Sequence, residues 1–267
     1  MATAEQSLLL GTSGYDYPEW KGVFYPDDLK RKDFLSYYST QFNALELNNT
    51  FYNMPTSERM LSFYERSEGR LSFSVKANRL LTHEVGPDWK LQSKLFCDAV
   101  GPLLEKSSLC SVLFQFPQSF HYTPENRIYL AKLIDEFKSF PVVVEFRHEE
   151  WIKESVLAGL NDRGASIALC DMPDLKYLPK FAPTLQTSPL FYLRLHGRNA
   201  TAWYTDTNTP NGSARYDYNY SDQELSQFVP VIQNAVLTGK KPVVFFNNHP
   251  NGNGAKNAKR LFELLKK

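Results

Sequence analysis

The segment Pro141–Arg147 reads PVVVEFR, and the segment Leu190–His196 reads LFYLRLH. Each is a short apolar run that ends in two polar side chains separated by one apolar residue. These side chains are Glu145 with Arg147, and Arg194 with His196. Because side chains alternate along a strand, both members of a pair lie on the same side. Uninterrupted apolar runs of this length are typical of strands buried in a parallel sheet. Both segments therefore predict buried strands whose carboxyl ends are polar.

Six further segments have the same character, which gives eight predicted strands. They are Leu8–Ser13, Phe42–Asn48, Leu71–Ala77, Leu109–Phe116, Pro141–Arg147, Ala165–Asp171, Leu190–His196 and Pro242–Asn248. Helix signals lie between them, and they predict helices from an Asp33 cap to Phe42 and over Ile128–Phe137, Trp151–Leu160, Leu225–Leu237 and Ala255–Leu265. The signals are a cap and proline at Thr123-Pro124 and a capping box that begins at Ser221.

Strands that alternate with helices predict right-handed βαβ units and a parallel sheet. Eight such units in 267 residues fit a single TIM-type (β/α)8 barrel, an α/β fold, over residues 7–267. The alternative is an open, doubly wound sheet. The glycines of the segment Gly11–Gly14 form no GxGxxG nucleotide fingerprint, and this favours the closed barrel.

Composition excludes several classes of protein. The chain is 42% hydrophobic with a net charge of +1, which is too apolar and too neutral for a disordered chain. Its 30 basic and 29 acidic residues argue against indiscriminate binding to polyanions. No apolar run is long enough for a membrane span. Residues 1–7 lack a secretory signal, and three separated cysteines suggest neither disulfides nor a zinc site, so we expect a cytoplasmic protein.

Polar side chains gather at the carboxyl ends of the predicted strands, where barrels of this kind carry their active sites. We predict the catalytic candidates Glu46, Glu145, Asp171 and His196. We predict the substrate-binding candidates Lys76, Gln115, Arg147, Arg194, Asn48, Asn247, Asn248, His83 and Tyr15. Structural alternatives remain open for several of them: a self-satisfied ion pair for Glu145 and Arg147, a turn for Asp171, a core position for His196, and loop hydrogen bonds for the amides.

The chemistry of this set favours an anionic ligand. Lys76, Arg147 and Arg194 suit a phosphate or carboxylate group. The carboxylates suit acid–base chemistry or a divalent metal, which His196, His83 and His148 would complete. No HxxxH, HExxH or HxH pair occurs. We therefore predict that no cofactor is required and do not favour a metal.

Aromatic residues follow the first, second and seventh predicted strands and flank the expected mouth. Their functional interpretation is stacking on a base or sugar, and their structural interpretation is a small core under long loops. We favour the small core for Trp20, Phe24 and Phe51. The segment 197–220 has no helix or strand period, which is typical of a lid or binding loop.

The sequence resembles the YecE-like family, known as domain of unknown function 72. The resemblance rests on Gly11–Tyr15 with Trp20–Pro26, Leu45–Tyr52, Phe73–Ala77 with Leu81–His83, Phe114–Pro117, Val144–His148 with Trp151, Arg194–Gly197 and Phe246–Asn248. It implies a TIM barrel comparable with xylose-isomerase-like and apurinic-endonuclease-like barrels, and by analogy a phosphate- or nucleic-acid-directed chemistry. The sequence lacks the histidine-rich cluster expected of those endonucleases, which argues against a three-metal mechanism.

Two functions follow as hypotheses. The favoured one is an enzyme, a hydrolase or lyase, that acts on a small phosphate- or other anion-bearing substrate by carboxylate and histidine acid–base chemistry. The alternative is a non-catalytic protein that binds a nucleotide or single-stranded nucleic acid. We expect no membrane partner, and the sequence predicts no oligomeric state.

Overall fold

The computed structural model describes residues 8–185, 187, 189–205 and 212–266. Eight parallel strands close into a barrel in sequence order, and β1 pairs with β8. The strands are β1 Leu9–Ser13, β2 Ala44–Leu47, β3 Ser72–Lys76, β4 Leu109–Gln115, β5 Val142–Glu145, β6 Ser166–Asp171, β7 Leu190–Leu195 and β8 Lys241–Phe246. The predicted TIM barrel is confirmed, and the open sheet is wrong because β1 and β8 join the edges. The part of the secretory-signal prediction that concerns residues 1–7 lies outside the described residues.

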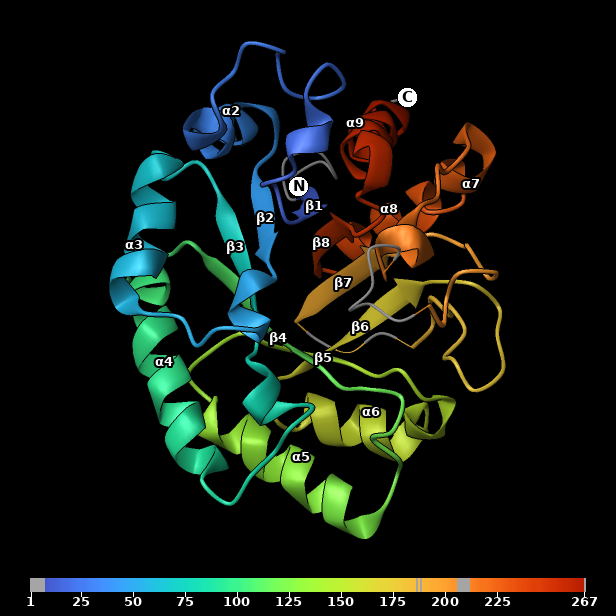
Figure 1. The fold of residues 1–267 in the computed structure, drawn as a ribbon. Coiled ribbons are helices and arrows are strands. Elements are labelled where there is room, and N and C mark those ends of the chain that lie inside the picture. The colour runs from blue at the N-terminus through green and yellow to red at the C-terminus, as the bar shows by residue number, and fades with distance from the viewer. Residues whose placement is uncertain (1–7, 186, 188, 206–211, 267) are drawn as a thin grey trace.

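Helices form a ring outside the strands (Figure 1). The helices are α2 Phe34–Gln41, α3 Ser57–Arg66, α4 Trp89–Glu105, α5 Pro124–Glu136, α6 Glu154–Asn161, α7 Asp222–Ser226, α8 Val229–Leu237 and α9 Asn253–Leu265. Sequence analysis did not predict α3 and α4. Between β6 and β7, the described residues contain no helix. None of the helices in the described part of the chain has the length and apolarity needed to cross a membrane.

Local signals account for some of the helix starts, with two corrections to the predictions. Thr123 accepts a hydrogen bond from the Asn126 N–H, and Ser221 forms the predicted capping box with Glu224. Asp33 stands at the N-cap of α2 but makes no capping hydrogen bond with its side chain. The single helix predicted over Leu225–Leu237 is divided into α7 and α8. Pro230 is the second residue of α8, because its ring is tolerated in a first turn but not in a helix interior.

Two apolar layers follow from the alternation of side chains along the strands. Outward residues such as Leu45 and Val75 pack under the helices. Inward residues such as Leu113, Val143 and Phe245 fill the barrel. The barrel interior is thus a packed core below its carboxyl end, as expected for this fold. Within the barrel formed by the described strands, room for a ligand lies above this core, at the mouth.

Strand register brings polar residues of neighbouring strands to a common level near the mouth. Glu46 of β2 lies beside Ser13 of β1 and Ser74 of β3. Gln115 of β4 lies beside Glu145 of β5. Polar side chains that are far apart in sequence therefore become neighbours.

The aromatic residues after β1 form a small core, as predicted. Trp20 and Phe24 are buried, and their rings meet edge to face with centroids 5.5 Å apart. The Trp20 indole N–H donates to the His249 carbonyl oxygen at 2.8 Å, which ties this loop to the segment after β8. These two aromatic residues stabilise the loop rather than line the mouth.

Candidate functional site

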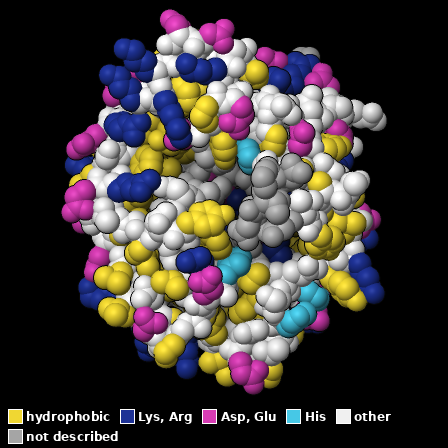
Figure 2. Space-filling view, viewed as in Figure 1, with side chains coloured by type: hydrophobic (Ala, Val, Ile, Leu, Met, Phe, Trp, Pro, Cys, Tyr) yellow, Lys and Arg dark blue, Asp and Glu magenta, His cyan; other side chains and the backbone are white. Residues whose placement is uncertain are grey.

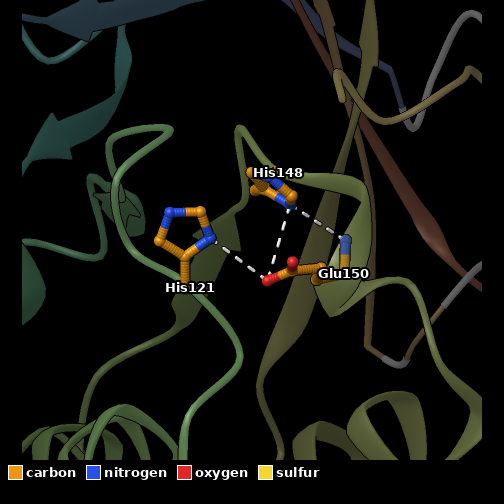
Figure 3. A group of neighbouring side chains, drawn as sticks. All are labelled: His121, His148 and Glu150. Carbon is orange, nitrogen blue, oxygen red and sulfur yellow. Dashed lines mark hydrogen bonds and ion pairs between the residues drawn. The ribbon is translucent and has the colours of Figure 1, made fainter. Parts of the chain in front are cut away.

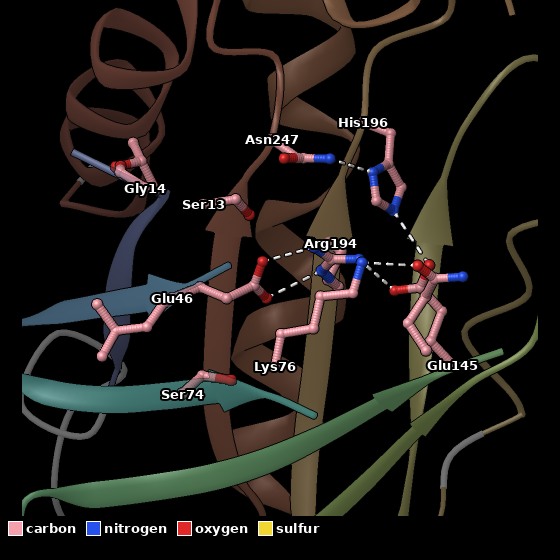
Figure 4. Close-up of polar contacts among 12 residues, drawn as sticks. Ser13, Gly14, Glu46, Ser74, Lys76, Glu145, Arg194, His196 and Asn247 are labelled. Carbon is pink, nitrogen blue, oxygen red and sulfur yellow. Dashed lines mark hydrogen bonds and ion pairs between the residues drawn. The ribbon is translucent and has the colours of Figure 1, made fainter. Parts of the chain in front are cut away.

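Four charged residues from three strand ends form what we call the mouth network: Glu46, Glu145, Arg147 and Arg194. Figure 4 shows Arg194 between Glu46 and Glu145. The Arg194 guanidinium donates to both oxygens of Glu46, at 2.9 and 2.5 Å. It also donates to Glu145 Oε2 at 2.5 Å. The Arg147 Nε–H donates to the other oxygen of Glu145 at 2.5 Å. Two guanidinium groups thus neutralise two carboxylates that are fully buried.

A layer of hydroxyl groups supports the mouth network from inside the barrel. The Tyr192 hydroxyl donates to Glu46 Oε2 at 2.9 Å and lies 2.7 Å from the Ser74 hydroxyl. Ser111 donates to Ser74 at 2.7 Å. Sequence analysis missed Tyr192, although its spacing of two from Arg194 places both side chains inside the barrel.

The charges of the mouth network fix the protonation of its members. Burial alone would raise the pKa of Glu145, but Arg147 and Arg194 outweigh burial and hold this pKa well below its usual range. Burial and the same two arginines hold the pKa of His196 well below its usual value. The Asn247 amide contacts His196 Nδ1 at 2.9 Å. Glu145 is therefore an ionised anchor for arginine, and His196 is a neutral imidazole.

A pocket of about 460 Å³ opens beside the mouth network. Its wall includes the predicted residues Lys76, His83, Gln115 and Arg147. It also includes Arg79 and Arg215, which no sequence signal distinguished, and the aromatic residues Phe51, Tyr52, Trp203, Tyr204 and Tyr216. Figure 2 shows a hollow near the middle of this face, with basic side chains at its bottom and apolar ones at its rim. The small-core interpretation of Phe51 is incomplete, because its ring lines the pocket.

Lys76 is held at the wall of this pocket by neutral groups. Its Nζ donates to Gln115 Oε1 at 2.8 Å and lies 4.2 Å from the centre of the Phe51 ring. Gln115 is itself oriented, because its amide donates to the Phe116 carbonyl oxygen at 2.8 Å. Burial and the nearby charge of Arg194 lower the pKa of Lys76 to about 7. Near neutral pH this side chain exchanges readily between ammonium and amine.

His83 lines the same pocket as a neutral base. Its ring meets Phe51 edge to face at 4.7 Å, and its Nδ1 lies 2.9 Å from the Thr82 hydroxyl. Burial and the charge of Lys76 lower the pKa of His83 to about 4. A neutral imidazole at the pocket wall can accept a proton from a bound ligand.

Asp171 does not join the other predicted carboxylates. It belongs to a second cluster, which we call the outer network: Asp171, Arg198, Tyr220 and Glu224. Arg198 donates to both oxygens of Asp171 at 2.8–3.1 Å and to Glu224 at 3.3 Å, and the Tyr220 hydroxyl donates to Asp171 at 2.7 Å. The inward residue of β6 is Cys170, which lies beside Glu145 and His196, so alternation turns Asp171 outward.

Three further predicted residues lie away from the pocket wall. Asn248 faces α9 and donates to Asn257 at 2.8 Å. Asn48 stands just past β2, and its buried Oδ1 has no protein partner. Tyr15 lines a separate groove of about 530 Å³ together with Arg31, Lys32, Arg59 and Arg66.

Among the residues that the structure describes, two groups of three side chains have donor atoms near enough to share a metal ion. In the first, His121 and His148 lie 3.2 and 3.8 Å from Glu150 Oε2 (Figure 3). Glu150 also accepts the Tyr122 N–H at 3.2 Å, and its own N–H donates to His148 at 3.3 Å. These contacts explain the grouping without a cation. The predicted combination of His196, His83 and His148 does not form.

The second group is Glu145, Cys170 and His196 inside the mouth. Arg147 and Arg194 both bond to the carboxylate of Glu145, which places two positive charges next to any cation bound there. Burial and the charge of Glu145 raise the pKa of Cys170 well above its usual value, so its sulfur is a protonated thiol. Thiolate is the form that binds metals. This environment suits an anion better than a cation.

A closed parallel barrel with a cationic pocket at the carboxyl ends of its strands defines a TIM-barrel protein. Residues 9–267 match the family described as protein of unknown function DUF72, and the chain belongs to this family. It is 28% identical over 253 residues to UPF0759 protein YunF of Bacillus subtilis (strain 168), covering 90% of this chain and 89% of YunF.

Solved structures agree with this family and this fold. A DUF72 family protein from Thermotoga maritima MSB8 is 34% identical with a TM-score of 0.88, covering 97% of this chain and 99% of that one. A xylose isomerase-like TIM barrel protein from Mycobacterium smegmatis, solved in complex with magnesium, is 14% identical with a TM-score of 0.54. That match covers 99% of this chain and 98% of the other, and it concerns the fold alone. It agrees with the predicted xylose-isomerase-like comparison.

Proposed function

We propose that this protein is an enzyme that binds a small anionic substrate, a phosphate-bearing molecule in particular, in the pocket at the barrel mouth. The observation that carries the proposal is an imbalance of charge. The mouth network is neutral by itself, and Arg79 on the pocket wall is paired with Glu84 at 3.3 Å. Lys76 and Arg215 add positive charge to the wall, and among the described residues neither has a carboxylate oxygen within 4 Å. An anion would complete this arrangement, as charge-assisted hydrogen bonds do at phosphate sites.

The residues take distinct roles in this proposal. Arg147 binds the anion, since Glu145 orients only its Nε–H and the guanidinium lies at the pocket wall. Lys76 supplies the second cationic contact. Glu46 and Glu145 position arginines and transfer no proton, because both oxygens of each carboxylate already accept hydrogen bonds from guanidinium groups. His83 is the proton acceptor on the pocket wall, and His196 fixes the orientation of Arg147, whose Nη2 lies 3.3 Å away.

Calorimetric titration with inorganic phosphate and pyrophosphate tests the binding step. We expect Arg147→Gln and Lys76→Met each to weaken binding roughly tenfold to a hundredfold, because a hydrogen bond to a charged group contributes ~1.5–3 kcal/mol. Lys94→Met is the matched control, since Lys94 is an exposed residue of α4 that pairs with Asp98. Unchanged affinity in both pocket variants would refute the proposal.

Turnover is tested separately with a panel of phosphate monoesters and diesters. We expect release of phosphate or loss of the parent compound with wild-type protein, and a deficit in His83→Gln that leaves phosphate affinity intact. If the panel binds but no member is converted, the enzymatic half of the proposal is wrong and the binding half stands.

The second candidate is binding of a nucleotide or a single-stranded nucleic acid. It is favoured by the aromatic wall, where Tyr52 and Tyr204 are among the most exposed large side chains. Bases stack on such rings without sequence preference. The affinity for a single strand should then fall linearly with salt concentration on logarithmic axes, whereas a small-anion site gives a shallow slope. Failure to retain oligonucleotides at low salt would eliminate this candidate.

A further inference from the structure

Lys76 differs from the arginines around it in the partners of its charged group. Within the described part of the chain, Arg147 and Arg194 have carboxylate oxygens within 4 Å, and no such oxygen lies that near Lys76 Nζ. Its partners are the neutral amide oxygen of Gln115 and the face of the Phe51 ring. A carboxylate would keep a lysine protonated, whereas an amide oxygen accepts a hydrogen bond from an amine as well as from an ammonium.

The position of Lys76 suits a nucleophile. It is the last residue of β3, on the side of the strand that faces into the mouth, and its side chain lines the pocket. The donation to Gln115 uses one N–H and leaves the lone pair of the neutral amine free. The Phe51 ring covers one side of Nζ, so a reactant approaches this nitrogen from the pocket.

The charges around Lys76 favour its neutral form. Burial and the positive charges of Arg194 and Arg147 lower the pKa of Lys76 to about 7, against the opposing effect of Glu145 and Glu46. An ordinary lysine has a pKa near 10.4, so at pH 7 Lys76 holds on the order of a thousandfold more free amine than a surface lysine. Desolvated lysines next to other cations are the ones that act as imine-forming nucleophiles.

We propose that Lys76 forms an imine with the carbonyl carbon of an aldehyde or ketone that also carries an anionic group. This rests on the proposed function, because Arg147 must hold the anion while the carbonyl group faces Lys76. The lone pair of Nζ attacks the carbonyl carbon, and a carbon–nitrogen bond replaces the carbon–oxygen π bond. The oxygen takes up two protons, both given up by Nζ, and leaves as water while the nitrogen lone pair forms the carbon–nitrogen π bond, so amine and carbonyl compound give imine and water without any redox partner.

His83 relays the proton between nitrogen and oxygen in this scheme. It lines the same pocket, contacts the same Phe51 ring and is neutral near pH 7. When the imine nitrogen takes up a proton, it carries the same positive charge as the ammonium form of Lys76. The mouth network therefore needs no rearrangement during the reaction.

Pyridoxal 5′-phosphate is the probe, since it combines an aldehyde, a phosphate group and a planar ring. Wild-type protein is treated at pH 7, reduced with borohydride and analysed by peptide mass mapping. We expect Lys76 to be modified ~100-fold or more faster than exposed lysines such as Lys94, in line with its larger fraction of free amine. Inorganic phosphate should slow this reaction, and pyridoxal, which lacks the phosphate, should react more slowly.

The outcomes separate the two proposals. If phosphate binds and Arg147→Gln weakens it, but Lys76 is labelled no faster than Lys94, the imine is refuted and the anion site stands. If Lys76 is labelled rapidly but phosphate neither binds nor competes, the anion site is refuted and the reactive amine stands. Peptide mapping of wild-type protein needs no variant, so a folding defect in Lys76→Met would not obscure either result.

A second probe tests the substrate class directly. Pyruvate and dihydroxyacetone phosphate are each incubated with wild-type protein and borohydride, and the intact mass is measured. We expect one reduced adduct in wild type and in Lys94→Met, and none in Lys76→Met. Adducts that form equally in all three proteins would overturn the assignment of Lys76.

Discussion

The mouth network and the outer network are both built from strand-end acids and arginines, yet they differ in burial and in charge balance. Arg194 and Arg198 are four residues apart in sequence. Arg194 is almost fully buried, with 3% of its side chain exposed, and bridges carboxylates of two other strands. Arg198 keeps 31% of its side chain exposed and pairs with Asp171 and Glu224. The first arginine lies inside the barrel and the second lies outside it.

The charge balance of the two networks points to different roles. The outer network sets one guanidinium against two carboxylates, so it has no positive charge to offer a ligand. The mouth network sets two guanidiniums against two carboxylates and stands beside Lys76, which adds positive charge. A similar pairing of residue types thus gives a structural clamp in one place and an anion-selective wall in the other.

The largest expected effect is the loss of Arg194. Arg194→Leu leaves Glu46 without its ion-pair partner and Glu145 with Arg147 alone, both at fully buried positions. Removing one partner of a buried ion pair costs ~3–5 kcal/mol. Urea unfolding should show a decrease of this size in the free energy of unfolding.

The control for this prediction neutralises Glu46, the carboxylate that loses its ion-pair partner. Glu46→Gln added to Arg194→Leu should recover part of the lost stability, because it removes an uncompensated buried charge. A decrease in the free energy of unfolding below ~1 kcal/mol in Arg194→Leu would mean that Arg194 contributes no more to stability than an exposed ion pair does.

Acid should weaken the mouth network through Glu145. The pKa of Glu145 in the folded protein lies below its value in the unfolded chain, about 4.3. The stabilisation is therefore fully present above pH 4.3 and is lost as the pH falls below it. We expect Glu145→Gln to unfold ~2 kcal/mol more easily than wild type at pH 7, with the difference narrowing towards pH 3. Urea unfolding across this range measures it, and a constant difference would contradict the assignment.

The barrel was predictable because its signal is redundant. Eight apolar runs each marked a strand, and Val142–Glu145 lies within the run that the pattern predicted. The polar residues of the mouth were predictable because side chains two residues apart in a strand lie on the same side of the sheet, as for Glu145 and Arg147. The helix α4 was missed because its sequence, with Pro102 inside it, has no cap or stop signal that stands out locally.

Other parts of the site depend on information that one strand does not contain. Asp171 was grouped with the mouth because it ends a strand, but the structure turns Cys170 inward instead. Alternation places Cys170 and Asp171 on opposite sides of the strand and does not decide which side faces the barrel. Arg79 and Arg215 reach the pocket from short loop helices, whose path is decided by tertiary packing. No spacing rule in the sequence predicts such contributions.

Removing Lys76 should have an effect of opposite sign on stability. The pKa of Lys76 is about 7 in the folded protein and about 10.4 in the unfolded chain. The unfolded state binds more protons between these values, so the contribution of Lys76 to stability rises with pH across pH 7–10. The difference in pKa corresponds to ~4 kcal/mol at pH 7, and loss of the hydrogen bond to Gln115 and of side-chain packing offsets part of it. Lys76→Met should therefore raise the free energy of unfolding by ~1–2 kcal/mol at pH 7, and this gain should shrink towards pH 10.

Bound phosphate should have the opposite effect on the protonation of Lys76, which gives a second test of its titration. An anion in the pocket favours the ammonium form of Lys76, so its affinity for wild-type protein should increase as the pH falls from 8 to 6. Calorimetry at several pH values measures this, with correction for the ionisation of phosphate by comparison with Lys76→Met. An identical pH dependence in both proteins would show that Lys76 does not titrate in the pocket.

The smallest expected effect belongs to the outer network. Arg198→Met removes the guanidinium that binds Asp171, but the Tyr220 hydroxyl still donates to that carboxylate, and Asp171 lines an open pocket that water can enter. A partly exposed ion pair is worth ~1 kcal/mol or less. Urea unfolding should show a loss of this size, and phosphate affinity should stay within twofold of wild type.

A loss of stability as large as that of Arg194→Leu, or a tenfold loss of phosphate affinity, would mean that the two networks act as one unit. Gly197 offers one route for that coupling, since it follows His196, has a φ of 89° that favours glycine, and donates its N–H to the Tyr220 hydroxyl at 2.9 Å. The His196 N–H, which donates to the Asp171 carbonyl oxygen at 2.9 Å, offers another. Combining Arg198→Met with Arg147→Gln then decides the matter, because independent networks give additive losses of stability and coupled ones do not.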